Sequence, residues 1–321
     1  MSKYTKAYSI TPHNTNAIDP RPDAYYVGDG NYTNGHDDGD FYNPSVWFRL
    51  DDARGSSPIT GLASYGTSSK PDMDSVATVN KVTGNAATNF VDYVHFTAAS
   101  SHITVNDNAA FNIGTGEFEM MAVVRFEDNG DQYQHIATRD KGASNWGWLR
   151  RSDAAGSNTG KITFSISGTN AYSADAPSYG TWYILGVSRD SSNNVQLWRD
   201  GATDGSSISN SADLDADADD NLIIGAMHNG TSYVQGVQGD MAEFILWETS
   251  LSTAERAAVV ANLQDRYFND RRGKLVTCTD PSDADTYSIT YPPIGKIIDD
   301  SPKYIRDSGK QASDIVGLKE K

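Results

Sequence analysis

Hydrophobic and polar residues alternate with a period of two through the middle of this chain. The cleanest run is 117–126, where the apolar face is formed by every second residue: Phe118, Met120, Ala122, Val124 and Phe126. The opposite face, which includes Met121 and Val123, is also partly apolar, as in a strand at the middle of a sheet.

The same alternation predicts further strands, separated by Gly, Asn, Asp and Ser turns, near 46–50, 133–139, 145–151, 161–167, 182–189, 194–200 and 241–248. Many short strands at this spacing indicate a sandwich or a barrel rather than a parallel sheet. The segment from about 51 to 89 is rich in Ser, Thr and Asp, and we expect a long connection there.

One stretch carries a helical period. Ser252 and Glu255 form a capping box, and Val260, Leu263 and Tyr267 then recur at helical spacing. The pattern predicts a helix from Thr253 to about Tyr267. No other long helical signal is present, so we expect a β protein with one helix.

The segments around this helix resemble a known family. The order L-I-I-G at 222–225, E-F-I-L-W at 243–247 and L-S-T-A-E at 251–255 resembles the closing segment of laminin-G-like domains, in the concanavalin A-like lectin and glucanase group. Upstream segments resemble the same family in the same order: 94–96, 103–105, 111–119, 180–187 and 195–201. The resemblance covers about residues 45–270 and implies an all-β fold, a two-sheet antiparallel jelly-roll sandwich.

The resemblance divides the chain into three parts. Residues 45–270 are expected to be the laminin-G-like jelly-roll domain, and residues 1–44 and 271–321 are expected to be extended terminal arms. The arms are polar and rich in turn formers, so they order by packing on partners. We expect these partners to be other virion proteins or copies of the same chain in a homo-oligomer.

Charge excludes some partners. The chain has 26 Lys and Arg against 42 Asp and Glu, a net charge of −16. This charge repels phosphate backbones, so we expect no nucleic-acid and no anionic-membrane partner. No run of about 18 apolar residues that could span a membrane is visible, and the first residues show no apolar core of an export signal.

The cysteine content bears on where in or outside the cell the protein functions. With a single cysteine, Cys278, the chain cannot form an intrachain disulfide. Laminin-G-like domains mostly meet ligands outside cells, yet this sequence shows neither an export signal nor paired cysteines. A tailed-phage virion protein, made in the host cytoplasm and released by lysis, reconciles these observations. A cytoplasmic bacterial protein is the alternative.

The sequence argues against catalysis, and we expect no catalytic residues. Glucanases of this group carry E-x-D-x-E on one strand, which places nucleophile and acid about 5 Å apart. That motif is absent: Glu117-x-Glu119 lacks the central Asp, and Asp240 and Glu243 are three residues apart. We interpret these carboxylates as solvated or hydrogen-bonded strand residues.

An acidic loop is the candidate metal site. Carboxylates alternate at Asp213, Asp215, Asp217 and Asp219. Calcium takes 6–8 oxygen ligands, and the resemblance implies calcium at the loop rim. A plain solvated acidic loop is the alternative, and no other cofactor is expected.

Two groups of residues are candidates for glycan binding, because sugar rings stack on exposed aromatic rings. One group is Trp146 and Trp148, and the other is His228, Asn229 and Tyr233. The tryptophans share one strand face, so core packing is the alternative for them.

Two function classes follow. The first is a structural virion protein of a tailed bacteriophage, a capsid decoration, head fibre or tail fibre whose sandwich also binds carbohydrate. The second is a glycan-binding adhesion protein, either a tail fibre or a bacterial surface lectin, which rests on the family resemblance alone. In both, the sandwich faces solvent and host-surface glycans are candidate ligands.

Overall fold

A computed structural model of the 321-residue chain describes residues 44–268, apart from 66–72, 89–90, 131, 140–145, 155 and 216–220, together with Tyr42 and three short terminal strands. The chain divides into two compact units. One unit is residues 37–267, and the other combines residues 1–36 with 268–321.

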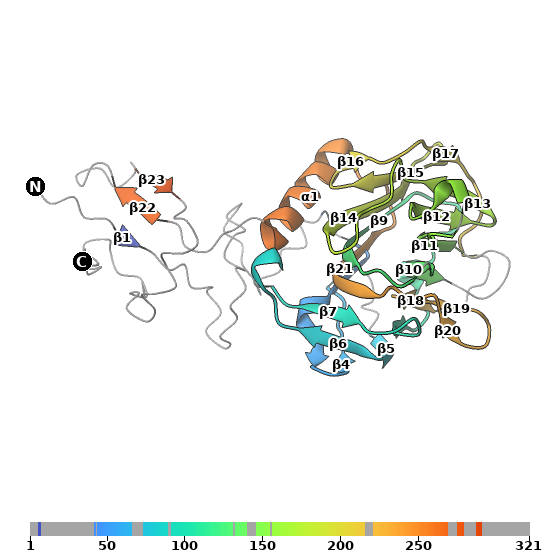
Figure 1. The fold of residues 1–321 in the computed structure, drawn as a ribbon. Helices are drawn as coiled ribbons and strands as arrows, with labels where there is room; N and C mark the ends of the chain where they lie inside the picture. The colour runs from blue at the N-terminus through green and yellow to red at the C-terminus, as the bar shows by residue number, and fades with distance from the viewer. Residues whose placement is uncertain are drawn as a thin grey trace, which may run out of the picture. The chain divides into compact units, whose positions relative to one another are not determined.

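The larger unit contains a nine-stranded antiparallel sheet (Figure 1). Seven of its strands follow one another across the sheet in the order β16 (Ala202–Thr203), β15 (Asn194–Arg199), β14 (Trp182–Arg189), β9 (Phe118–Phe126), β21 (Gly239–Trp247), β7 (Tyr93–Phe96) and β6 (Val79–Val82). Two more pair at the side, β17 (Ile208–Ser209) with β15 and β2 (Val46–Arg49) with β21. The long strands β9 and β21 therefore lie at the middle.

A second, seven-stranded antiparallel sheet lies in the same unit. Its order is β13 (Thr169–Tyr172), β12 (Ile162–Ile166), β11 (Trp146–Arg150), β10 (Gln134–Arg139), β18 (Leu222–Ile224), β8 (His102–Val105) and β5 (Met73–Ala77). The described part of the unit also has two hairpins, β3 (Arg54–Gly55) with β4 (Ile59–Gly61) and β19 (Met227–His228) with β20 (Tyr233–Val234). Its four short 3-10 helices are Leu50–Asp52, Ala86–Thr88, Ala109–Phe111 and Gly156–Asn158.

The two sheets enclose one hydrophobic core. Phe118 of β9 and Phe164 of β12 belong to different sheets, and their ring centroids are 5.5 Å apart. The apolar face predicted for 117–126 contributes all five of its residues to this core. The two-sheet antiparallel sandwich expected from the sequence is therefore confirmed.

Gly225 shows how closely the core is packed. Its φ of +90° is one that residues with a side chain rarely adopt, and a Cβ there would lie 2.1 Å from Phe96 Cε1. Glycine is required both by the backbone and by the packing of β18 against Phe96.

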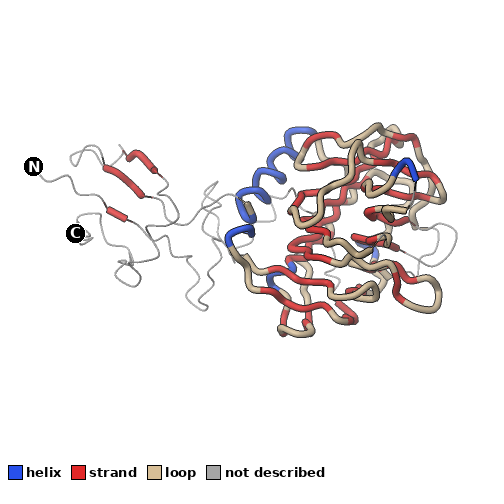
Figure 2. Tube along the Cα trace, in the orientation of Figure 1, coloured by secondary structure: helices blue, strands red, loops and turns tan. Residues whose placement is uncertain are grey.

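The helix α1 (Thr253–Tyr267) has the predicted bounds and lies on the outer side of the nine-stranded sheet (Figures 1 and 2). The predicted capping box forms, because Glu255 Oε2 accepts a hydrogen bond from Ser252 N at 2.8 Å and Ser252 Oγ accepts one from Glu255 N at 3.3 Å. Within the described residues, α1 and the shorter helices lack the length and apolar character of a membrane span.

The prediction of a long connection from about residue 51 to residue 89 was wrong. This segment contributes β5 and β6 to the two sheets and also forms the β3–β4 hairpin. Its Ser, Thr and Asp residues hid these strands, because β5 is largely exposed and shows little apolar alternation.

The smaller unit contains a three-stranded antiparallel sheet of β1 (Lys6–Ala7), β22 (Leu275–Cys278) and β23 (Tyr287–Thr290). Lys6 pairs with Val276, so the beginning and the end of the chain share one sheet. The boundaries at 44 and 271 and the docking role of the terminal segments stay predictions.

Candidate functional site

The two sheets differ in what covers their outer faces. The nine-stranded sheet is covered by α1, whose Val259 and Leu263 are fully buried. The seven-stranded sheet has a pocket of about 390 Å³ on its outer face. Ligand pockets typically measure about 300–1,000 Å³, so this face is the candidate ligand site.

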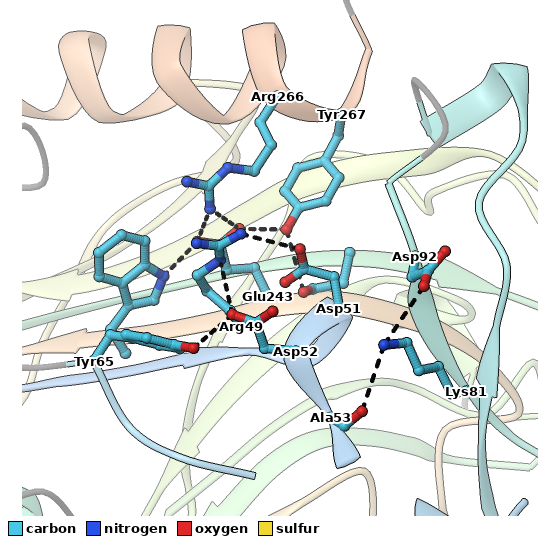
Figure 3. A network of polar contacts seen from close by, with 12 residues as sticks. Arg49, Asp51, Asp52, Ala53, Tyr65, Lys81, Asp92, Glu243, Arg266 and Tyr267 are labelled. Atoms are coloured by element: carbon cyan, nitrogen blue, oxygen red, sulfur yellow. Dashed lines mark hydrogen bonds and ion pairs between the residues drawn. The ribbon is translucent and has the colours of Figure 1, made fainter. Parts of the chain in front are cut away.

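The carboxylate of Glu243 fastens the end of α1 to the nine-stranded sheet. Arg266 Nη1 lies 3.1 Å from Glu243 Oε1, and the Tyr267 hydroxyl donates to Glu243 Oε2 at 2.5 Å. Trp47 Nε1 also donates to this carboxylate. Figure 3 shows Arg266 and Tyr267 pointing from the helix toward Glu243, with Arg49 and Asp51 beside it. The side chain of Glu243 is completely buried in this network.

Glu119 fastens the other end of the helix. Arg256 binds it with two hydrogen bonds, Nε to Oε1 at 2.6 Å and Nη2 to Oε2 at 2.7 Å. The Arg256 guanidinium also lies 3.8 Å from the centroid of the Trp198 ring. Glu119 and Glu243, two of the four carboxylates considered for acid–base chemistry in the sequence, are therefore buried and paired beneath a helix.

The pocket is built on two neighbouring rungs of the seven-stranded sheet. One rung places Thr138, Gly147, Ser165 and Asn170 side by side across four strands. The next rung, on the same face, places His135, Leu149 and Thr163 side by side. A register shift between His135 and Ala137 brings both His135 and Thr138 to this face, although they are three residues apart.

His135 forms part of the pocket wall. Its Nδ1 lies 3.1 Å from the carbonyl oxygen of Gln235 and must donate to it, so Nε2 of the neutral ring is an acceptor. Burial lowers the pKa of His135 to about 4, against a smaller opposing effect of the Gln235 hydrogen bond. The imidazole is thus neutral at pH 7 and can accept a hydrogen bond from a ligand hydroxyl.

Gly147 leaves space at the floor of the pocket. A Cβ built there would lie 3.6 Å from His135 Cδ2 and 3.7 Å from His135 Nε2, both ordinary van der Waals distances. The backbone at Gly147 has no positive φ. A side chain would therefore be accepted by the fold and would fill the pocket.

Two polar groups at the pocket have no hydrogen-bond partner among the described residues. The Thr163 hydroxyl is buried and has no hydrogen-bond partner. Arg151 Nε is also buried without one. Gln235 has a positive φ of 54° and brings its carbonyl to His135. Unsatisfied buried polar groups are rare in folded proteins and often mark ligand sites.

Trp146 and Trp148 are not a sugar platform. They are 2% and 0% exposed and face the core, where the Trp146 ring centroid is 5.7 Å from that of Phe164. A ring must be exposed to stack on a sugar, so the core-packing alternative holds for both. The pocket lies mainly on the opposite face of the same strand, at Gly147 and Leu149, and Trp146 also forms part of its lining.

The second predicted group lies on the β19–β20 hairpin. Tyr233 stacks on His102 with ring centroids 3.4 Å apart, and its hydroxyl lies 3.2 Å from Thr104 Oγ1. His228 is paired with Tyr233 across the hairpin. Asn229 Oδ1 accepts hydrogen bonds from the backbone N–H groups of Thr231 and Ser232 in the turn. The hairpin also supplies Met227 to the pocket, so the group borders the site, and its role as ligand contact stays a prediction.

The acidic loop is described only in part. Asp215 Oδ1 lies 2.7 Å from Arg139 Nη1, and Asp213 Oδ1 accepts from Asp215 N at 2.9 Å. The Arg139 guanidinium therefore pairs with Asp215 in the described part of this loop. Asp217 and Asp219 lie outside the described residues, so the calcium prediction remains a prediction.

Another cluster with acidic residues lies at the nine-stranded sheet. Atoms of His95, Glu127 and Asp240 lie within 4.8 Å of one another. Arg125 already binds both carboxylates, with its Nε 2.5 Å from Asp240 Oδ2 and Nη2 3.3 Å from Glu127 Oε1. Because this guanidinium supplies the positive charge, the group forms a salt-bridge cluster.

Comparison with protein families agrees with this architecture. Residues 97–255 match a family described as the concanavalin A-like lectin/glucanases superfamily. Over these residues the sandwich is similar to that superfamily. The matched segment runs from the residue after β7 into the first turn of α1 and includes the strands that form the pocket. A comparison with curated proteins finds no matching sequence.

Solved structures show the same lectin-like fold. The binding domain of Paraclostridial Mosquitocidal Protein 1 superposes with a TM-score of 0.51 at 11% identity over 70% of this chain and 53% of that one. The receptor binding domain of botulinum neurotoxin C/D mosaic serotype gives a TM-score of 0.50 at 10% identity over 69% and 52%. This chain thus spans about half the length of both structures, and the likeness concerns the fold.

Trp146 is the one candidate from the sequence that lines the pocket of this lectin-like domain, and the other pocket residues were missed. Gly147 and Leu149 alternate with the two tryptophans, so the period of two already placed them on the other face of the strand. What the sequence could not show is which face carries the pocket. That depends on the bulge at His135 and on the β19–β20 hairpin.

Proposed function

We propose that this protein is a carbohydrate-binding module and that its ligand site is the pocket on the outer face of the seven-stranded sheet. The observation that carries the proposal is the contrast between the two outer faces. A helix held by buried ion pairs covers one, and the other has a pocket lined by hydroxyl, amide and imidazole groups.

The composition of the pocket suits a sugar. Thr163, Ser165 and Asn170 offer side-chain donors and acceptors, His135 offers an acceptor, and Tyr133 offers an aromatic ring. Sugars present hydroxyls around an apolar ring, so a site with a few polar groups and one aromatic surface is complementary to them. The lectin-like fold supports this proposal.

We propose further that the module acts without catalysis. Glu119 and Glu243 are bound to arginines under α1, and Asp240 is bound to Arg125 and His95. A retaining or inverting glycosidase needs two carboxyl groups that flank the scissile bond. The pocket lining, as far as the structure describes it, includes no carboxylate.

A tailed-phage virion is the setting that we propose for the module. Three features support it: the net charge of −16, the single cysteine, and a smaller unit in which β1 pairs with β22. A unit built from both ends of the chain is suited to attach one sandwich to other virion proteins or to further copies. The sandwich would then be displayed on the particle as a decoration or fibre.

An array of neutral and acidic glycans, probed with the full-length protein, tests the binding proposal. We expect a restricted set of related glycans to be bound. Uniform binding to all glycans, or binding to none, would contradict the proposal. Turnover of a bound oligosaccharide, followed by chromatography, would contradict the non-catalytic part.

A further inference from the structure

The pocket contains an arginine that the described residues leave without a carboxylate. Neighbouring arginines are paired: Arg139 with Asp107 and Asp215, and Arg150 with Asp153. Arg151 lines the pocket, and no ion pair or side-chain hydrogen bond of its guanidinium is found in the described part of the chain.

Aromatic rings hold this guanidinium instead. Its central carbon lies 5.6 Å from the ring centroid of Tyr133 and 5.7 Å from that of Tyr172. Cation–π contacts of this length stabilise the charge without using its N–H groups. The terminal N–H donors of the guanidinium therefore stay available for an acceptor, in the fork geometry that matches a carboxylate.

We propose that the pocket selects sugars that carry a carboxylate, such as a uronic acid or a sialic acid, and that Arg151 binds this group. The inference rests on the proposed carbohydrate-binding function and names its ligand class. The remaining polar groups of the pocket, among them the unpartnered hydroxyl of Thr163, then serve the ring hydroxyls of the same sugar.

A carboxylate fits this site better than a sulfate or a phosphate. Among the described residues that line the pocket, Arg151 is the one cation, and the imidazole of His135 is neutral because burial lowers its pKa to about 4. One planar guanidinium balances one planar monoanion with two parallel hydrogen bonds. Polyanionic groups bind where several cations converge, and the pocket lining does not provide them.

The test is calorimetric titration of the full-length protein with three matched oligosaccharides, of glucuronic acid, of N-acetylneuraminic acid and of glucose. We expect at least one acidic oligosaccharide to bind about tenfold or more tightly than the glucose oligosaccharide, the ratio typical of one charged hydrogen-bonded pair. Arg151→Gln is expected to remove this preference, so that acidic and neutral oligosaccharides bind with similar affinity. Arg54→Gln, which removes an exposed arginine outside the pocket, is the matched control and is expected to keep the preference.

The outcomes separate this inference from the proposed function. Equal binding of acidic and neutral oligosaccharides would overturn the inference and leave carbohydrate binding standing, whereas no binding of any of them would overturn both. A preference that survives Arg151→Gln would overturn the role of Arg151. Competition by inorganic sulfate as strong as that by glucuronate would overturn the choice of a carboxylate. Thermal unfolding of each variant shows whether the fold is kept.

Discussion

The fold determines the position and the tautomer of His135, and the same residue lines the pocket. The strand pattern predicted β10 but gave no reason to choose His135 over its neighbours. Its exposure to the pocket depends on the register shift before Ala137, and its tautomer depends on the Gln235 carbonyl. Both are tertiary features, so only the structure could identify this residue.

The buried imidazole predicts a pH dependence of stability. The pKa of His135 is lowered to about 4 in the folded state, against about 6.5 in an unfolded chain. The unfolded state therefore binds more protons between these values, and the free energy of unfolding falls as pH is lowered from about 6.5 to 4. The loss is on the order of 3 kcal/mol at most, and above about pH 6.5 this group adds no pH dependence.

Urea denaturation of wild type and His135→Asn at several pH values between 4 and 8 measures this dependence. The asparagine amide can still donate to the Gln235 carbonyl, so the variant is expected to fold. We expect a shallower decrease of stability for the variant in the acidic half of the range. Identical slopes for the two proteins would contradict the assignment.

At the scale of elements, the strands with apolar alternation and the capped helix were predictable. The bounds of α1 and the apolar face of β9 follow from local patterns. β5 was not predictable, because it is an exposed strand at the edge of its sheet and its pairing with β8 gives no apolar period. The buried ion pairs under α1 were also hidden, since the sequence does not show which charges meet across 137 residues, as Glu119 and Arg256 do.

The Glu119–Arg256 pair predicts a large cost for a single substitution. Arg256→Met leaves the Glu119 carboxylate, which is 0% exposed, buried without its cation and should cost about 3–5 kcal/mol of unfolding free energy. The double variant Glu119→Gln, Arg256→Met should recover part of this loss. Chemical denaturation measures both.

Lys81→Met is the matched control for that experiment. Its ammonium lies 3.5 Å from Asp92, and both side chains are partly exposed, so the expected change is about 0–1 kcal/mol. Equal losses for Arg256→Met and Lys81→Met would show that α1 is not fastened by the buried pair.

At the scale of the whole molecule, the chain divides into two compact units, and we propose that the unit formed by the terminal segments serves attachment. Residues 1–36 belong to a different compact unit from residues 37–267. The polar composition of the ends indicated a role with partners, but it could not indicate that β1 and β22 form one sheet, because that pairing joins residues about 270 positions apart.

Deletion of residues 1–36 tests the proposed attachment. The truncated chain loses β1 but keeps Pro44 and Ser45, which are buried. We expect thermal unfolding of the sandwich within a few degrees of wild type and loss of incorporation into particles. Incorporation at the wild-type level would show that the sandwich itself is the attachment surface.

The central claim is that the outer face of the seven-stranded sheet binds a glycan, and Gly147 gives the most direct test of it. The test is calorimetric titration of an array-positive glycan into wild type, Gly147→Val and the control Gly61→Val. The control changes a strand glycine outside the pocket, where a Cβ would lie 3.4 Å or more from the nearest atoms. We predict binding at least about tenfold weaker for Gly147→Val, unchanged binding for Gly61→Val, and little change in thermal stability for either. Wild-type affinity in a folded Gly147→Val protein would contradict the claim.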